Sequence, residues 1–117
     1  MVNEISQGDV YWVDFGQRAD SAAAERHPCV VVQCDLFNRS RIGTTMVCLI
    51  TSNLRRAQAP GNVALNTGDA NLPKPGVVSV SQVLTVNKGD LGERLGKLPA
   101  SVVDSIRAGL ELLFNRI

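Results

Sequence analysis

The residues best suited to chemistry are an arginine and a histidine that stand directly before a proline, at positions 26–28. A histidine side chain changes its protonation near neutral pH, so His27 is the best-matched acid or base in this chain. Arg26 stays charged and can bind a phosphate through two parallel hydrogen bonds. Solvated side chains on a surface loop are the simpler interpretation of both residues.

A second polar group, Thr51, Ser52 and Asn53, ends an apolar run. Hydroxyl and amide groups at a strand end can donate to a phosphate, or they can satisfy the backbone of the following turn. RNA cleavage through the 2′-hydroxyl of the RNA needs a base, an acid for the departing 5′-oxygen and donors to the charged phosphorane. This reaction requires no metal ion.

Two further residues are candidates for contact with a nucleotide base. Phe15 stands next to a long polar loop, where its ring could stack on a base, whereas Tyr11 and Trp12 are expected in the core. Gln82 interrupts an apolar strand pattern. It could face either a base or a neighbouring strand.

Polar loops supply the other candidates. Ser21 and Glu25 lie in the first loop, where Glu25 could orient the residues that follow it or remain solvated. Residues 36–68 contain no Asp or Glu but four arginines, at positions 39, 41, 55 and 56, although the whole chain carries a net charge of only +1. Such a cluster, with Arg55 and Arg56 in the second loop, can attract phosphates or form a solvated surface.

Length and composition indicate one globular domain over residues 1–117, with 44% hydrophobic and 20% charged residues. No apolar run approaches the ~18 residues of a membrane span, so no membrane association is expected. The three cysteines form no Cys-x-x-Cys pair and read as small buried hydrophobes. With one histidine they do not match zinc spacing. No cofactor or metal is therefore expected, and free thiols favour the cytoplasm.

Hydrophobic periodicity predicts a mainly β (α+β) fold: a small twisted antiparallel barrel or sheet, in meander order, with a C-terminal amphipathic helix. Strands are expected at 9–15, 28–34, 44–51, 61–66, 76–86 and 94–97, with loops or turns at 16–26, 35–42, 52–60 and 66–75. Apolar residues at three- and four-residue steps predict the helix over 99–117, with Pro99 in its first turn and Asp104 near its start.

Six short motifs, in order from end to end, make the whole chain resemble the MazF/PemK-type toxin endoribonucleases of type II toxin–antitoxin systems. They lie at residues 8–14, 27–35, 47–53, 61–63, 79–83 and 91–98. Each motif is short, but their order across the chain makes the resemblance specific. The first reads Gly-Asp-Val-Tyr-Trp-Val-Asp and the third ends in Thr-Ser-Asn.

The resemblance implies a homodimer of SH3-like barrels that cuts single-stranded RNA, including mRNA, at short sequences and without a metal. It also implies a cognate antitoxin partner. The family's catalytic residues are the arginine directly before the proline and the threonine that ends the third strand. Thr51 matches the threonine, whereas His27 stands at the arginine position and Arg26 lies one residue earlier.

That departure leaves two assignments open: Arg26 performs the family's arginine role, or His27 takes it. The first loop also departs from the family, because 22–24 are alanines where glycines are usual. Two alternative functions follow from these features. The chain could be a non-enzymatic toxin that binds DNA gyrase, since a shared scaffold does not settle function. It could also be a relative that has lost catalysis and binds only the antitoxin.

Overall fold

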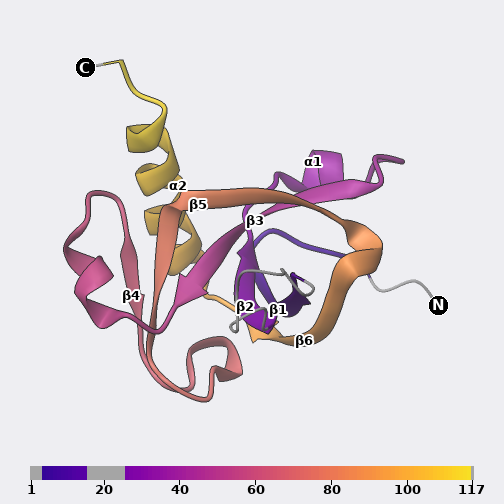
Figure 1. Cartoon of the computed structure of the whole chain (residues 1–117). Coiled ribbons are helices and arrows are strands. Elements are labelled where there is room, and N and C mark those ends of the chain that lie inside the picture. The colour runs from indigo at the N-terminus through magenta and orange to yellow at the C-terminus, as the bar shows by residue number, and fades with distance from the viewer. Residues whose placement is uncertain (1–3, 16–25, 117) are drawn as a thin grey trace.

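A computed structural model of the chain describes residues 4–15 and 26–116, which form one antiparallel sheet and a C-terminal helix (Figure 1). The strands are β1 (Asp9–Asp14), β2 (Arg26–Val31), β3 (Thr44–Thr51), β4 (Val63–Leu65), β5 (Gly76–Asn87) and β6 (Leu91–Lys97). The helices are α1 (Asp35–Asn38), α2 (Ala100–Leu113) and three short 3-10 turns, η1 (Leu54–Gln58), η2 (Asp69–Asn71) and η3 (Lys88–Asp90). The predicted fold class is confirmed.

The strand order is β4-β5-β3-β2-β1-β6, so the simple meander predicted from the sequence is wrong. Strand β5 lies between β3 and β4 because its first residues pair on both sides. Val77 is opposite Thr51 of β3 and opposite Ala64 of β4. The beginning of β5 and the end of β3 are thereby held together at one end of the sheet.

Strand β5 also bends the sheet. Cys48 pairs with Val83 whereas Leu49 pairs with Ser79, so residues 80–82 have no partner on β3. Extra residues on one strand bend that strand and increase its twist. The chain then curves from β5 into β6 at the opposite edge, next to β1 (Figure 1). The result is a sheet curled into half a barrel.

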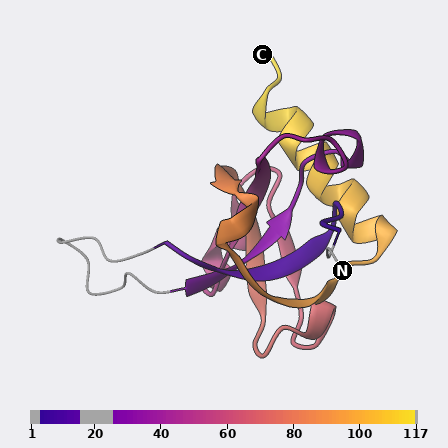
Figure 2. The ribbon, with the colours of Figure 1, turned by 90° about the vertical axis from the view of Figure 1, so that its right-hand side faces the viewer.

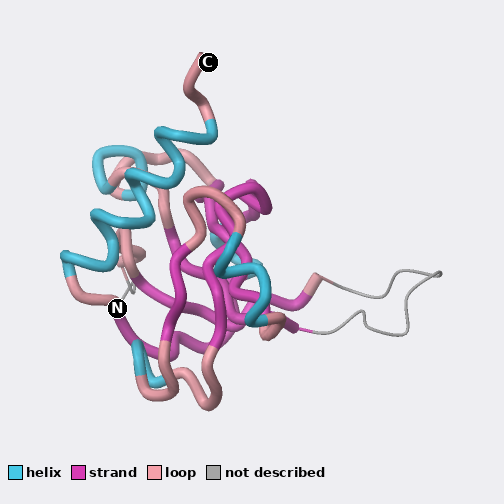
Figure 3. Tube along the Cα trace, turned by 90° about the vertical axis from the view of Figure 1, so that its left-hand side faces the viewer, coloured by secondary structure: helices cyan, strands magenta, loops and turns pink. Residues whose placement is uncertain are grey.

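Helix α2 lies against one face of this sheet (Figures 2 and 3). Each face carries its own cluster of buried apolar side chains, because successive residues of a strand point to opposite faces. The face under α2 holds Val10, Val30, Cys48, Ile50, Leu65, Leu72, Val78, Val80, Leu98 and Ile106. The inner face of the curl holds Tyr11, Val13, Cys29, Val31 and Val47.

Strand β2 begins and ends earlier than the predicted range 28–34. It ends at Val31 because the amides of Val32 and Gln33 both donate to the same carbonyl, that of Met46. The chain then turns into α1, which leaves Cys34 exposed and contradicts its expected burial. Cys29 and Cys48 are buried as expected, and burial raises the pKa of each thiol to about 12.

The C-terminal helix is shorter than the predicted range 99–117. Pro99 precedes its first residue, and Asp104 lies beyond its first turn. The apolar side chains of its first three turns cover the sheet, with Ile106 fully buried. Leu113 and Phe114, expected on the same buried face, are instead 42% and 71% exposed.

Helix α2 meets the segment before β4 at a contact between two glycines. A Cβ atom added to Gly109 would lie 2.1 Å from the carbonyl oxygen of Gly61, whose φ is +77°. Only the absence of both side chains allows the backbones to approach this closely. The contact therefore sets the position of α2 on the sheet.

We predict that Gly109→Ala lowers the free energy of unfolding by about 1–3 kcal/mol. The clash with backbone outweighs the gain of about 1 kcal/mol in helix propensity. Gly89→Ala is the control, because nothing lies within 4 Å of its added Cβ. Chemical denaturation of both variants measures the effect, and equal stability of the two would contradict the close approach.

Candidate functional site

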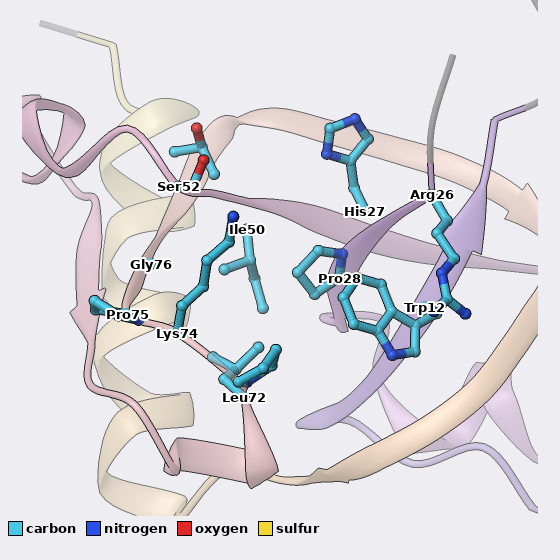
Figure 4. Close-up of a pocket in the computed structure, with 12 residues that line it drawn as sticks. Trp12, Arg26, His27, Pro28, Ile50, Ser52, Leu72, Lys74, Pro75 and Gly76 are labelled. Atoms are coloured by element: carbon cyan, nitrogen blue, oxygen red, sulfur yellow. The ribbon is translucent and has the colours of Figure 1, made fainter. Parts of the chain in front are cut away.

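A pocket with a volume of about 460 Å³ lies where β2 and β5 begin and β3 ends (Figure 4). Its lining brings together the three residues that the sequence and the family resemblance put forward as catalytic. The lining residues are Trp12, Arg26, His27, Pro28, Ile50, Thr51, Ser52, Leu72, Pro73, Lys74, Pro75 and Gly76. Buried Ile50 and Leu72 belong to the core under α2, so the packed sheet forms the pocket's floor.

Strand register brings His27 and Thr51 to the same face of the sheet. The pairing of β2 with β3 sets Cys29 opposite Leu49. Two residues further along each strand are His27 and Thr51. Both are still within the sheet there, because His27 pairs with Val13 and Thr51 pairs with Val77. Because successive side chains of a strand alternate between faces, His27 shares the face of Cys29 and Thr51 shares the face of Leu49.

Arg26 points to the opposite face of β2 from His27, as alternation along a strand requires. Figure 4 shows the two side chains diverging, with Arg26 beside Trp12. The Arg26 guanidinium lies 4.6 Å from the centroid of the Trp12 ring, the geometry of a cation–π contact. Asp14 stands opposite Arg26 in the register of β1 and β2. Trp12, expected in the core, is thus half-buried at the pocket.

The His27 side chain is half-buried and is held from two sides. Its ring lies 6.1 Å from that of Phe15, centroid to centroid, at an interplanar angle of 46°. The buried thiol of Cys29 donates to the His27 carbonyl over 3.7 Å. Phe15 therefore joins the site through the histidine, from outside the pocket lining.

The Thr51 hydroxyl oxygen accepts a hydrogen bond from the backbone N–H of Asn53 over 3.1 Å. That bond uses a lone pair, and the hydroxyl hydrogen can still donate to a ligand. Asn53 is itself engaged, because its side-chain oxygen accepts from the backbone N–H of Arg55 and caps η1. Ser52 is exposed and adds a second hydroxyl to the lining.

The other predicted residues lie at varying distances from the pocket. Arg55 and Arg56 are exposed on η1, outside the lining, and Gln82 is half-buried beside the bend of β5. Ser21 and Glu25 fall outside the described residues. The arginines of the acid-free stretch do not all act alike, because Arg39 forms ion pairs with Glu4 at 3.5 Å and Asp35 at 4.0 Å.

Two lining residues were missed by sequence reasoning. The sequence pattern predicts Trp12 in the core, because aromatic residues in strands are usually buried. For Lys74 the sequence pattern predicts only a place in a turn region. Its available signal was a charged residue between two prolines, Pro73 and Pro75, which restrict the backbone on either side. In Figure 4 the Lys74 side chain extends beside Ile50, with its nitrogen toward Ser52.

The pocket is basic. Arg26, His27 and Lys74 are among the described residues that line it, and none of those residues is an aspartate or glutamate. Together with two hydroxyls, this set suits an anion such as a phosphate. Fold and site thus define a small antiparallel β-domain with a basic pocket at one end of its sheet.

Residues 6–114 match the model of a family described as the PemK-like, MazF-like toxin of type II toxin–antitoxin systems. The chain is 42% identical to endoribonuclease MazF6 of Mycobacterium tuberculosis over 111 residues, which are 95% of this chain and 97% of the relative. The chain therefore belongs to the PemK-like, MazF-like toxin family, and the resemblance read from its motifs is confirmed.

Solved structures share the fold. An endoribonuclease in complex with its cognate antitoxin, from a mycobacterial species, has a TM-score of 0.71 at 22% identity, covering 95% of this chain and 93% of that one. A MazE–MazF structure from Deinococcus radiodurans has a TM-score of 0.73 at 24% identity, covering 95% and 96%. Neither helix within the described residues has the length and apolar character needed to cross a membrane.

Proposed function

We propose that this chain is a toxin that cleaves single-stranded RNA, including mRNA, at short sequences. The RNA 2′-hydroxyl attacks the adjacent phosphorus, and the bond from phosphorus to the 5′-oxygen breaks. The products are a 2′,3′-cyclic phosphate and a 5′-hydroxyl. The composition of the pocket carries the proposal: three basic groups and two hydroxyls, with no carboxylate among the described lining residues. The endoribonuclease relative at 42% identity supports the same activity.

In this proposal His27 and Thr51 act on the scissile phosphate. They share one face at the end of the β2–β3 pair, so one phosphate can contact both. His27 transfers protons, as histidine does near neutral pH. Thr51 donates its hydroxyl to the phosphorane. Arg26, on the other face against Trp12, adds positive charge to the pocket without reaching the same phosphate.

Wild-type protein is predicted to cut a long RNA in EDTA, because the nucleophile is the RNA's own hydroxyl. Thr51→Ala should lower the cleavage rate by roughly 100-fold, the usual cost of one donor to a developing oxyanion. Sequencing of fragment ends should find 5′-hydroxyls at discrete positions. Thr51→Ser should cut nearly as well as wild type, because it keeps the hydroxyl that also accepts from Asn53.

Thermal unfolding of each variant must match that of wild type for the comparison to hold. Intact RNA with folded wild-type protein would contradict the proposal. That result would favour a toxin that binds DNA gyrase, tested by supercoiling, or a relative that binds only its antitoxin. Full activity of folded Thr51→Ala would remove Thr51 from the proposed mechanism.

Single variants of the two adjacent basic residues should separate their roles. His27→Ala is expected to lower the cleavage rate by about 10²–10⁴-fold, the usual range for a general acid or base. Arg26→Ala is expected to cost much less. His27→Arg tests the role directly, because arginine keeps the positive charge but is a poor general acid or base. If His27 transfers protons, His27→Arg should lose activity to the same extent as His27→Ala; if the position supplies only charge, His27→Arg should cut as well as wild type.

Normal cutting by His27→Ala, together with a large loss of cutting in Arg26→Ala, would assign the family's arginine role to Arg26. Tryptophan emission provides a folding control for Arg26→Ala, since Trp12 is the chain's only tryptophan and contacts Arg26.

The proposed partners are single-stranded RNA, a cognate antitoxin and a second copy of the chain. The antitoxin follows from family membership and from the mycobacterial relative solved with its own antitoxin. A cytoplasmic location suits the free thiols of Cys29, Cys34 and Cys48. The homodimer is supported by the end of α2, where Leu112, Leu113 and Phe114 are large, apolar and exposed.

Static light scattering is expected to give twice the mass of one chain for the purified wild type. Replacing Leu113 and Phe114 with serine should produce monomers at micromolar concentration, because it removes apolar area that the second copy would cover. Leu36→Ser is the matched control, as Leu36 is 77% exposed on α1. A monomeric wild type would contradict the dimer, and dissociation of Leu36→Ser alone would move the interface to α1.

A further inference from the structure

Lys74 is a charged residue of the pocket that neither the sequence motifs nor the proposed reaction uses. It stands opposite Trp12 and Arg26, across the floor formed by Ile50 and Leu72 (Figure 4). The pocket therefore has a fixed cation on each of two walls. Between them lies mostly apolar surface.

The backbone around Lys74 is unusually restricted for an exposed residue. Pro73 and Pro75 fix their own φ angles, and each proline also restricts the residue before it. The next residue, Gly76, is buried and pairs with Leu65 at the start of β5. A Cβ on Gly76 would lie 2.7 Å from the Ile50 side chain, so the segment is seated directly on the pocket floor. The lysine is thus presented from a rigid base.

We infer that Lys74 binds a second backbone phosphate of the RNA, next to the scissile one, so that the strand is held between Lys74 and the His27–Thr51 pair. This inference rests on the proposed function, because it assumes that the pocket holds an RNA strand. Lysine binds phosphate as a point charge and makes no contact with a base. Lys74 therefore increases the affinity for RNA and positions the strand, without sequence preference.

The charge of the pocket favours this role over that of a solvated lysine. No acidic residue is among the described lining residues, and the ion pairs found among the described residues involve other cations. An extended strand of single-stranded RNA needs cations along its path rather than at one point. Arg26 and Lys74, from β2 and from the segment before β5, provide them on opposite sides.

The test measures binding without cleavage. Two 2′-O-methyl RNA oligonucleotides of unrelated sequence and about ten residues, within the usual site size, serve as probes. They lack the free 2′-hydroxyl that the reaction needs. Fluorescence anisotropy of labelled probes gives the affinity over a series of salt concentrations. Emission from Trp12, the only tryptophan, reports occupancy of the pocket itself.

Lys74→Gln should weaken binding several-fold and equally for both sequences. The slope of log affinity against log salt should fall in magnitude by about 0.7, the value for one phosphate contact on a single strand. Lys74→Arg should restore both values, because it restores the charge. Lys97→Gln is the matched control, since Lys97 is an exposed lysine on β6 that lines a different hollow with Glu4 and Asp9.

An unchanged affinity and salt slope in Lys74→Gln would overturn the inference. A loss confined to one of the two sequences would also overturn it, because that pattern indicates contact with a base. Absence of binding by wild type would do the same. Failure of the proposed function is separate: wild type would then bind the probes with a Lys74-dependent slope and leave a long RNA intact.

Discussion

The alternation of side chains where β2 begins governs the arrangement of the whole pocket. Arg26 and His27 are adjacent in the chain, so the sheet must send them to opposite faces. The face that receives His27 also receives Thr51, through the register set by Cys29 and Leu49. A shift of one residue in that register would bring Arg26 to the threonine instead. The buried clusters on both faces resist such a shift, because it would exchange their apolar residues.

Much of the fold follows from local sequence pattern, whereas the strand order does not. The predicted strand at 44–51 matches β3 to the residue, since it is a continuous apolar run between two threonine-containing ends and turn residues flank it. The position of β5 between β3 and β4 depends on which strands pair across the sheet. Hydrophobic periodicity within one segment does not determine that pairing. The short β6 was underestimated because it contains two glycines and three charged residues, a composition unlike that of most strands. Its place beside β1 depends on the curl introduced by β5.

The pocket could be predicted only in part, because its lining comes from segments that only the folded sheet brings together. Arg26, His27 and Thr51 carried recognisable motifs, and the folded chain brings all three to one lining. Lys74 lies in no motif, and Trp12 lies in the first motif but is expected in the core. Both enter the lining because β1 and the segment before β5 lie beside the same strand ends. Arg55 and Arg56 were selected by charge alone. The chain places them on η1, outside the lining, in a turn that Asn53 caps.

This chain has histidine where the family has arginine, directly before the proline. The permanent positive charge of that arginine must therefore come from other residues of the pocket. Arginine combines a permanent charge with a planar pair of donors, so one residue can both bind and neutralise a phosphate. Histidine exchanges protons well but carries full charge only part of the time near neutral pH. A chain that places histidine at this position needs permanent charge from nearby groups. Arg26, held on Trp12 at 4.6 Å, and Lys74, held between two prolines, are permanent cations on either side of that histidine. In the reaction proposed here, proton transfer and charge neutralisation are therefore divided among three residues.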